Sequence, residues 1–169
     1  MTLPALGILT GISYISGLDY YRGINERFCA DMPQGHLMVP NPPIVMASVD
    51  CDEYVHYLTL GAFDKVAEHI LHGVRKLVAA GCDLLVIASN TGHISVPAIE
   101  QEFPALRILH IADCFAFRLK QRGISNVGLI GTKPTMEEDY LKARLSLHGI
   151  TTVVPAEEKI QEEIYEIIC

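Results

Sequence analysis

The sequence lacks several features that would assign it to common classes of protein. Its 169 residues contain no apolar run near the roughly 20 residues of a membrane-spanning helix. Lys and Arg number 13 against 20 Asp and Glu, and no basic run occurs, which argues against a nucleic-acid partner and against a membrane surface. Half of the residues are apolar and 20% are charged, a composition typical of a globular chain with buried strands.

The cysteines form no recognisable framework. There are five, an odd number, and no two of them have C-x-x-C spacing, which argues against a structural zinc site or a set of disulfides. We therefore predict a reducing, cytoplasmic environment. The first 13 residues lack the basic region and the cleavage signature of a signal peptide, so we expect them to hold a first strand.

Short runs rich in Val, Ile and Leu alternate with segments of helical periodicity, as in α/β proteins. The predicted strands span residues 6–9, 44–49, 84–88, 108–111, 127–130 and 151–154, and the predicted helices span 18–29, 63–80, 94–102, 114–122, 136–147 and 159–168. Residues 32–43 are rich in proline and are predicted to form a surface loop. The fold class predicted is α/β, with an open, mostly parallel sheet flanked by helices.

A weak internal repeat indicates two pseudo-symmetric halves. The segment LGILTG at 6–11 resembles VGLIGT at 127–132, although a chance match among Gly-rich strand ends is the alternative. We predict a first half over residues 1–112, which carries the loop Ser89-Asn90-Thr91, and the start of a second half over 113–169. The second half has two predicted strands against four in the first, so it is either small or truncated in this chain.

Small polar residues follow three of the predicted strands, where ligands bind in open parallel sheets. These segments are Thr10–Ser13, Ser89–His93 and Gly131–Thr135. Each precedes a helix, whose free N–H groups suit a small carboxylate. No P-loop or G-x-G-x-x-G pattern points to a phosphate. The alternative is that these residues only cap helices.

Taken in order, five segments resemble the cofactor-independent aspartate/glutamate racemase family along nearly the whole chain. They are LGILTGISYISGLDYYRGINE, ASVDCDEY, AAGCDLLVIASNTGH, ILHIADCFA and VGLIGTKPTMEEDYLKARL. The resemblance implies an enzyme of two α/β halves with its active site in the cleft between them. It further implies a homodimer that uses neither pyridoxal phosphate nor a metal ion, and a small acidic amino acid, aspartate or glutamate, as substrate.

The resemblance also implies the roles of individual residues. Racemisation removes the Cα proton and returns it to the opposite face, which requires an acid/base group on each side of that carbon. Ser89 stands at the position of the first group, with His93 as its assisting base. The implied substrate contacts are Ser13, Ser16, Asn90, Thr91, Thr132 and Thr135. The second group is a cysteine in the family, and the repeat would place it beyond Cys169.

Several residues depart from the family's pattern. Cysteine, or in some members threonine, is usual at the position of Ser89, and a hydroxyl is a far weaker acid than a thiol. Thr10 replaces a common glycine, Ile12 a methionine, Gly92 a larger residue and Leu58 a polar one. Three interpretations of Ser89 remain open: an asymmetric racemase, a deliberate replacement of cysteine, or an inactive ligand-binding relative. A lyase or isomerase acting on a small dicarboxylate is a further alternative.

Overall fold

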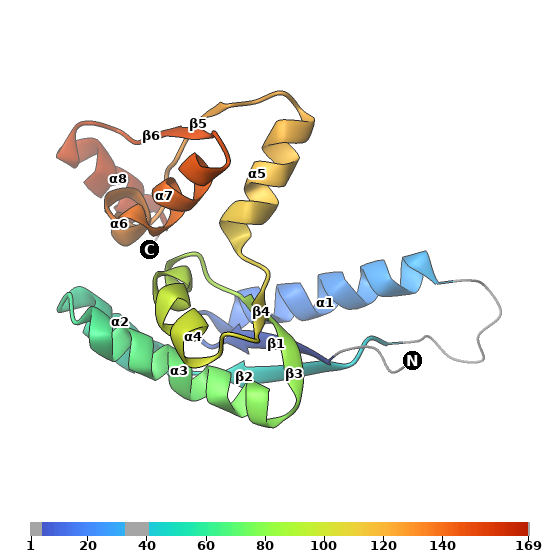
Figure 1. Ribbon diagram of the computed structural model, residues 1–169. Coiled ribbons are helices and arrows are strands. Elements are labelled where there is room, and N and C mark those ends of the chain that lie inside the picture. Colours follow the sequence, from blue (N-terminus) through green and yellow to red (C-terminus); the bar gives the residue numbers. More distant parts are fainter. Residues whose placement is uncertain (1–4, 33–40, 169) are drawn as a thin grey trace. The chain divides into compact units, whose positions relative to one another are not determined.

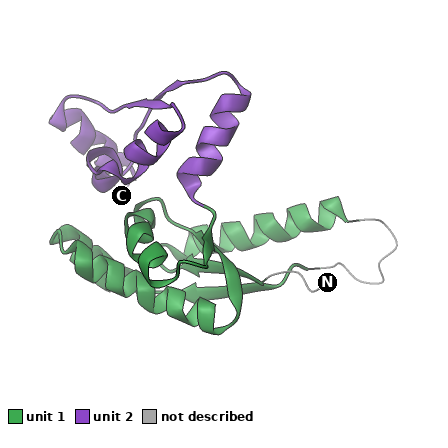
Figure 2. Cartoon of the chain, in the orientation of Figure 1, with its two compact units in different colours: residues 1–109 green, residues 110–169 purple. Residues whose placement is uncertain are grey.

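The computed structural model describes residues 5–32 and 41–168. The chain divides into two compact units, Met1–Leu109 and His110–Cys169, and each is described by itself (Figure 2). Most of the predicted loop over 32–43 lies outside the described residues, as does Cys169. The predicted family halves, divided after residue 112, stay a prediction.

Unit 1 is built on a four-stranded sheet in which every neighbouring pair is parallel (Figure 1). Its strands are β1 (Ala5–Thr10), β2 (Ile44–Ser48), β3 (Cys82–Ile87) and β4 (Arg107–Ile108), in the order β2-β1-β3-β4. Parallel strands need crossover connections, which the helices supply. The predicted parallel sheet flanked by helices is confirmed.

Helices lie on both faces of this sheet. Helix α1 (Tyr14–Asp31) packs on β1, whereas α3 (Phe63–Ala79) packs on β1, β2 and β3 and also contacts α4 (Val96–Glu102). A short 3-10 helix, η1 (Thr91–Ser95), leads into α4. Helix α2 (Cys51–Thr59), of whose nine residues only Tyr54 is buried, was not predicted.

The core of unit 1 lies between α3 and the sheet. Val66, Ile70, Val74 and Leu77 form one face of α3 and are at most 1% exposed. They belong to one cluster with apolar side chains of the strands, such as Leu85. Burial of each such side chain contributes about 1.5–3 kcal/mol, so this face fixes α3 on the sheet.

Unit 2 has a two-stranded parallel sheet of β5 (Asn126–Gly128) and β6 (Thr151–Val153). Its helices are α5 (Ile111–Gln121), α6 (Lys133–Glu137), α7 (Asp139–Leu147) and α8 (Glu158–Ile168). Side chains of α5 and α7, among them Ala116 and Leu145, form a second and smaller apolar cluster.

Two predicted elements differ from the structure in this part of the chain. The strand predicted over 108–111 ends at Ile108, because His110 caps α5: its Nδ1 accepts a hydrogen bond from Ala112 N–H at 3.1 Å. The single helix predicted over 136–147 is two helices, since Glu138 has extended backbone angles between α6 and α7. The last carbonyl groups of a helix have no hydrogen-bond partner within it. The ammonium of Lys142 donates to one of these in α6, the carbonyl oxygen of Glu137, at 2.8 Å.

Within residues 5–32 and 41–168, no helix is both long enough and apolar enough to cross a membrane.

Candidate active site

The sheet order places a topological switch point between β1 and β3. From β1 the chain continues to β2 on one side and later returns to β3 on the other side. In open α/β sheets, ligands bind beside such a point, at the carboxyl ends of the two strands, which here are β1 and β3. The predicted segments Thr10–Ser13 and Ser89–His93 begin at these two strand ends.

Ser89 lies two residues beyond the end of β3 and is partly exposed. Its Oγ accepts a hydrogen bond from the main-chain N–H of Gly92 at 3.2 Å. A donor aimed at a hydroxyl oxygen stabilises negative charge on it, so this bond favours the ionised form of the side chain. Sequence inspection missed the Gly92 N–H, because every residue except proline carries one and only the turn decides where it points.

His93 is almost completely buried, at 1% exposure, within η1. Its Nδ1 lies 2.7 Å from the main-chain oxygen of Ser89 and 3.3 Å from that of Asn90. Carbonyl oxygens only accept, so Nδ1 carries the hydrogen and the ring holds the backbone of the loop. The structure thus brings His93 to Ser89, with Nδ1 on the main-chain oxygen of that residue. Its predicted role in proton transfer stays a prediction.

Two predicted substrate contacts in unit 1 occupy helix N-cap positions without capping. Ser13 precedes α1 and Asn90 precedes η1, and neither side chain accepts a capping hydrogen bond. Both are exposed. The alternative that they only cap helices is therefore wrong for this pair. Thr91 lies inside η1 and is 9% exposed, and its assignment as a substrate contact stays a prediction.

Ser16 and Cys51 make hydrogen bonds to main-chain oxygens of residues that follow β3 and β1. Ser16 lies in the first turn of α1, which begins at Tyr14, four residues before the predicted start at residue 18. Its Oγ donates to main-chain oxygens. The thiol of Cys51, at the start of α2, donates to the main-chain oxygen of Ile12 at 2.9 Å.

Thr132 and Thr135 belong to unit 2, at the start of α6. Their hydroxyl oxygens lie 3.0 Å apart, and Thr135 Oγ1 is also 3.3 Å from the hydroxyl of Tyr140. Thr132 occupies the N-cap position without a capping hydrogen bond, and Thr135 is 3% exposed. Their assignment as substrate contacts stays a prediction.

Two aspartates that follow predicted strands have structural contacts. Asp50 caps α2, since its Oδ1 accepts from the N–H of Glu53 at 2.9 Å. Asp113, in the first turn of α5, accepts hydrogen bonds from Arg144 at 2.9 and 2.8 Å and lies 2.8 Å from His148 Nε2. The hydrogen bonds from Arg144 lower the pKa of Asp113 to about 2, against the opposing effect of partial burial.

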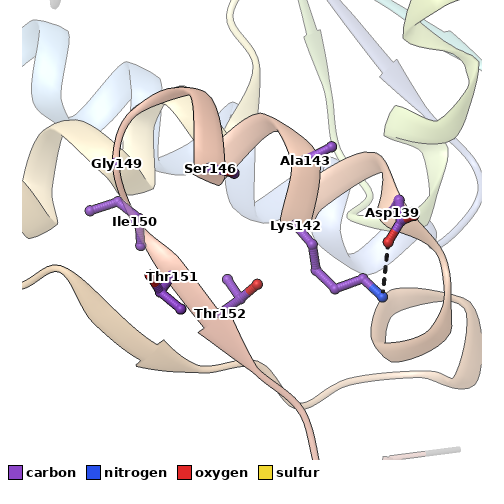
Figure 3. Close-up of a pocket in the computed structure, with 8 residues that line it drawn as sticks. All are labelled: Asp139, Lys142, Ala143, Ser146, Gly149, Ile150, Thr151 and Thr152. Atoms are coloured by element: carbon purple, nitrogen blue, oxygen red, sulfur yellow. Dashed lines mark ion pairs between the residues drawn. The ribbon is translucent and has the colours of Figure 1, made fainter.

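A cavity of about 480 Å³ lies in unit 2, between α7 and β6 (Figure 3). Polar side chains such as Lys142, Ser146 and Thr152 line it, and Lys142 forms an ion pair with Asp139 at 3.2 Å. None of its lining residues is a predicted site residue. Among the residues that the structure describes, no group of three or more His, Cys, Asp or Glu side chains is placed to hold a metal ion.

Two departures from the family's pattern have a steric explanation. A Cβ on Gly17, the only buried residue of α1, would overlap the side chain of Thr10, so the threonine at one position requires the glycine at the other. Leu58 packs against the apolar cluster of unit 1, which explains an apolar residue there.

The fold is that of an α/β protein with a parallel sheet, in which small polar residues follow β1 and β3 at the switch point. Residues 9–168 match the model of the Asp/Glu/Hydantoin racemase family. The structure is similar to that of a candidate Asp/Glu racemase from Yersinia pestis, with 33% identity and a TM-score of 0.85, over 98% of this chain and 70% of that one.

Two further structures are similar over 98% of this chain. An aspartate racemase homologue from Pyrococcus horikoshii OT3 has 25% identity, a TM-score of 0.78 and 70% of its own chain covered. The aspartate racemase of Picrophilus torridus, with 20% identity, a TM-score of 0.66 and 74% of its chain covered, shares the fold. The chain belongs to the Asp/Glu/Hydantoin racemase family, and racemases are isomerases.

Proposed function

We propose that the protein catalyses cofactor-independent racemisation of aspartate, glutamate or both, with Ser89 as one of its two acid/base groups. The observation that carries the proposal is the position of Ser89 at the β1/β3 switch point, where its Oγ accepts a hydrogen bond from Gly92 N–H. Membership of the racemase family supports the reaction class. Two of the similar structures are an Asp/Glu racemase candidate and an aspartate racemase homologue, which supports an acidic amino acid as substrate.

The chemistry of a hydroxyl makes the proposed mechanism asymmetric. A neutral Ser89 hydroxyl is a competent proton donor to a Cα carbanion, but it is a poor base until it ionises. In one direction, a second group on the opposite face takes the Cα proton and the Ser89 O–H bond breaks to deliver a proton to Cα. In the reverse direction the Ser89 oxygen must accept the proton, with its negative charge stabilised by the N–H of Gly92.

This asymmetry has a kinetic signature. The equilibrium constant of racemisation is one, so kcat/KM must be equal for the two enantiomers. Unequal roles of the two groups therefore show in kcat and in the rate at which each enantiomer exchanges its Cα proton with solvent. In the proposed site, Ser13 and Asn90 hold the polar groups of the substrate, because both are exposed and neither caps its helix.

Deuterium exchange tests the proposal directly. The full-length protein is incubated in D₂O with each enantiomer of aspartate and glutamate, while proton NMR follows loss of the Cα signal and chiral chromatography follows racemisation. We expect exchange and racemisation in the wild type and a loss of about 100-fold or more in Ser89→Ala, the usual contribution of an acid/base group. Ser146→Ala, which removes an exposed hydroxyl from α7, is the control and should retain full activity.

Ser89→Cys adds a second test in the opposite direction. A thiol ionises far more readily than a hydroxyl, so this variant should exchange the Cα proton faster than the wild type. An unchanged rate in both Ser89 variants would remove Ser89 from the proton path. Absence of exchange in the wild type, together with a raised melting temperature in aspartate or glutamate, would instead favour a ligand-binding protein.

A further inference from the structure

A side chain of α1 reaches across to the strand end that carries Ser89. Ser16 Oγ lies 2.6 Å from the main-chain oxygen of Ala88, a residue 72 positions away in sequence, and 2.9 Å from that of Ser13. The hydroxyl has one hydrogen, and the shorter distance indicates that it donates to the main-chain oxygen of Ala88. Ala88 is 1% exposed, so water cannot readily replace this donor.

The side chain of Ile12, in the loop between β1 and α1, lies against Gly92, at the other end of the Ser89 segment. An ideal Cβ built on Gly92 would lie 2.9 Å from Cδ1 of Ile12 and 2.9 Å from Cγ2 of Ile87, closer than real Cβ atoms approach other heavy atoms. Ile12 therefore occupies the space directly beside Gly92. The bond from the Cys51 thiol to the Ile12 carbonyl holds the backbone of Ile12 from the other side.

We propose that Ser16 and Ile12 form a clamp that fixes the Ser89 segment at both ends. Ser16 holds Ala88, the residue before Ser89, and Ile12 lies on Gly92, whose N–H bonds Ser89 Oγ. Both are positioning residues: they act on the orientation of the Ser89 hydroxyl through the backbone. For Ser16 this role replaces that of a substrate contact. The catalytic consequence rests on the proposed racemase function, whereas the clamp itself does not.

Kinetics separate positioning from substrate contact. Misplacing a reacting group by about 1 Å can lower the rate by about 100-fold, so Ser16→Ala should lower kcat by about 10- to 100-fold with little change in KM. Ser16→Thr keeps the hydroxyl and should recover most of the loss. Ile15→Ala, on the exposed side of the same helix turn, is the control and should behave as the wild type. A raised KM with unchanged kcat in Ser16→Ala would overturn the proposal.

A reciprocal pair of substitutions tests the contact at Gly92. Gly92→Ala places a methyl group against Ile12 and should lower kcat. Removing the Ile12 side chain beyond Cβ in the double variant Ile12→Ala/Gly92→Ala should restore part of the activity; recovery is partial because Ile87 still presses on the new methyl group. Each variant's activity is expressed relative to the wild type. If the relative activity of the double variant is no higher than the product of the relative activities of the two single variants, a direct contact between Ile12 and residue 92 is contradicted.

Hydrogen exchange without substrate distinguishes failure of the clamp from failure of the proposed function. Ser16→Ala should accelerate exchange of the main-chain amides of residues 89–92, with no change at residues 66–77 of α3. Unchanged exchange at 89–92 would overturn the clamp even in an active racemase. Faster exchange at 89–92, in a protein whose wild type never exchanges the Cα proton of an acidic amino acid, would support the clamp and remove the proposed function.

Discussion

At the scale of single residues, Asp113 is the clearest case of a side chain whose protonation is set by its neighbours. Arg144 donates two hydrogen bonds to its carboxylate and His148 lies 2.8 Å away, and the pKa of Asp113 falls to about 2. A carboxylate whose pKa is lower in the folded state stabilises the fold above its unfolded pKa. That contribution is lost as the pH falls from about 4 through 2.

The lowered pKa of Asp113 predicts how the stability of the fold depends on pH. The unfolding free energy of the wild type should fall by about 1–2 kcal/mol more than that of Asp113→Asn between pH 5 and pH 2, since a side chain one-third exposed is partly screened. Urea unfolding followed by circular dichroism at a series of pH values measures the difference. Asp139→Asn, at a side chain 87% exposed, is the control. Equal pH profiles for wild type and Asp113→Asn would contradict the role of the Arg144 pair.

At the scale of elements, helix α2 has a capped and acidic first turn. Only Tyr54 is buried, whereas Asp50 caps the helix and Asp52 and Glu53 lie in its first turn. Acidic residues there compensate the positive end of the helix dipole. The sequence Asp50-Cys51-Asp52-Glu53 matches a capping box, and this local signal would have predicted the helix that apolar periodicity missed.

The cap is testable by one substitution. Asp50→Ala should lower the unfolding free energy by about 1 kcal/mol, because the N–H of Glu53 loses its acceptor. Asp50→Asn keeps an acceptor oxygen and should cost clearly less. Thermal or urea unfolding of the two variants measures both values. An equal loss in the two variants would show that the charge of Asp50, and not its hydrogen bond to Glu53, stabilises α2.

At the scale of the whole molecule, the chain belongs to the Asp/Glu/Hydantoin racemase family, and the resemblance implies that Ser89 stands where cysteine is usual. The resemblance predicts catalysis without pyridoxal phosphate or metal. Hydroxylamine traps pyridoxal phosphate, and EDTA removes metal ions. Neither reagent should then change the rate of Cα deuterium exchange by more than about twofold. Loss of a catalytic group typically lowers the rate by about 10²-fold or more. The exchange assay in D₂O measures both, and inactivation by either reagent would contradict the prediction. Homodimerisation and a cytoplasmic location also stay predictions.

The sequence by itself determined where the strands and most of the helices lie, and which residues are candidates for the site. Its apolar runs located the six strands of the described residues within a few residues. For β1 and β3 the physical reason is burial, because strands buried in a parallel sheet need continuous apolar side chains. The order of its motifs indicated the racemase family. The position of Ser89 just after a strand was visible in the same way, since strand ends are marked by the change from apolar to small polar residues.

Only the tertiary structure decided which of these residues meet. Strand order depends on long-range packing, and the order β2-β1-β3-β4 brings the loop after β1 beside the loop after β3. The bond from Ser16 to Ala88 and the contact of Ile12 with Gly92 follow from that order. No sequence spacing encodes them, because residues far apart in the chain become neighbours only when the sheet pairs its strands and the helices pack on it.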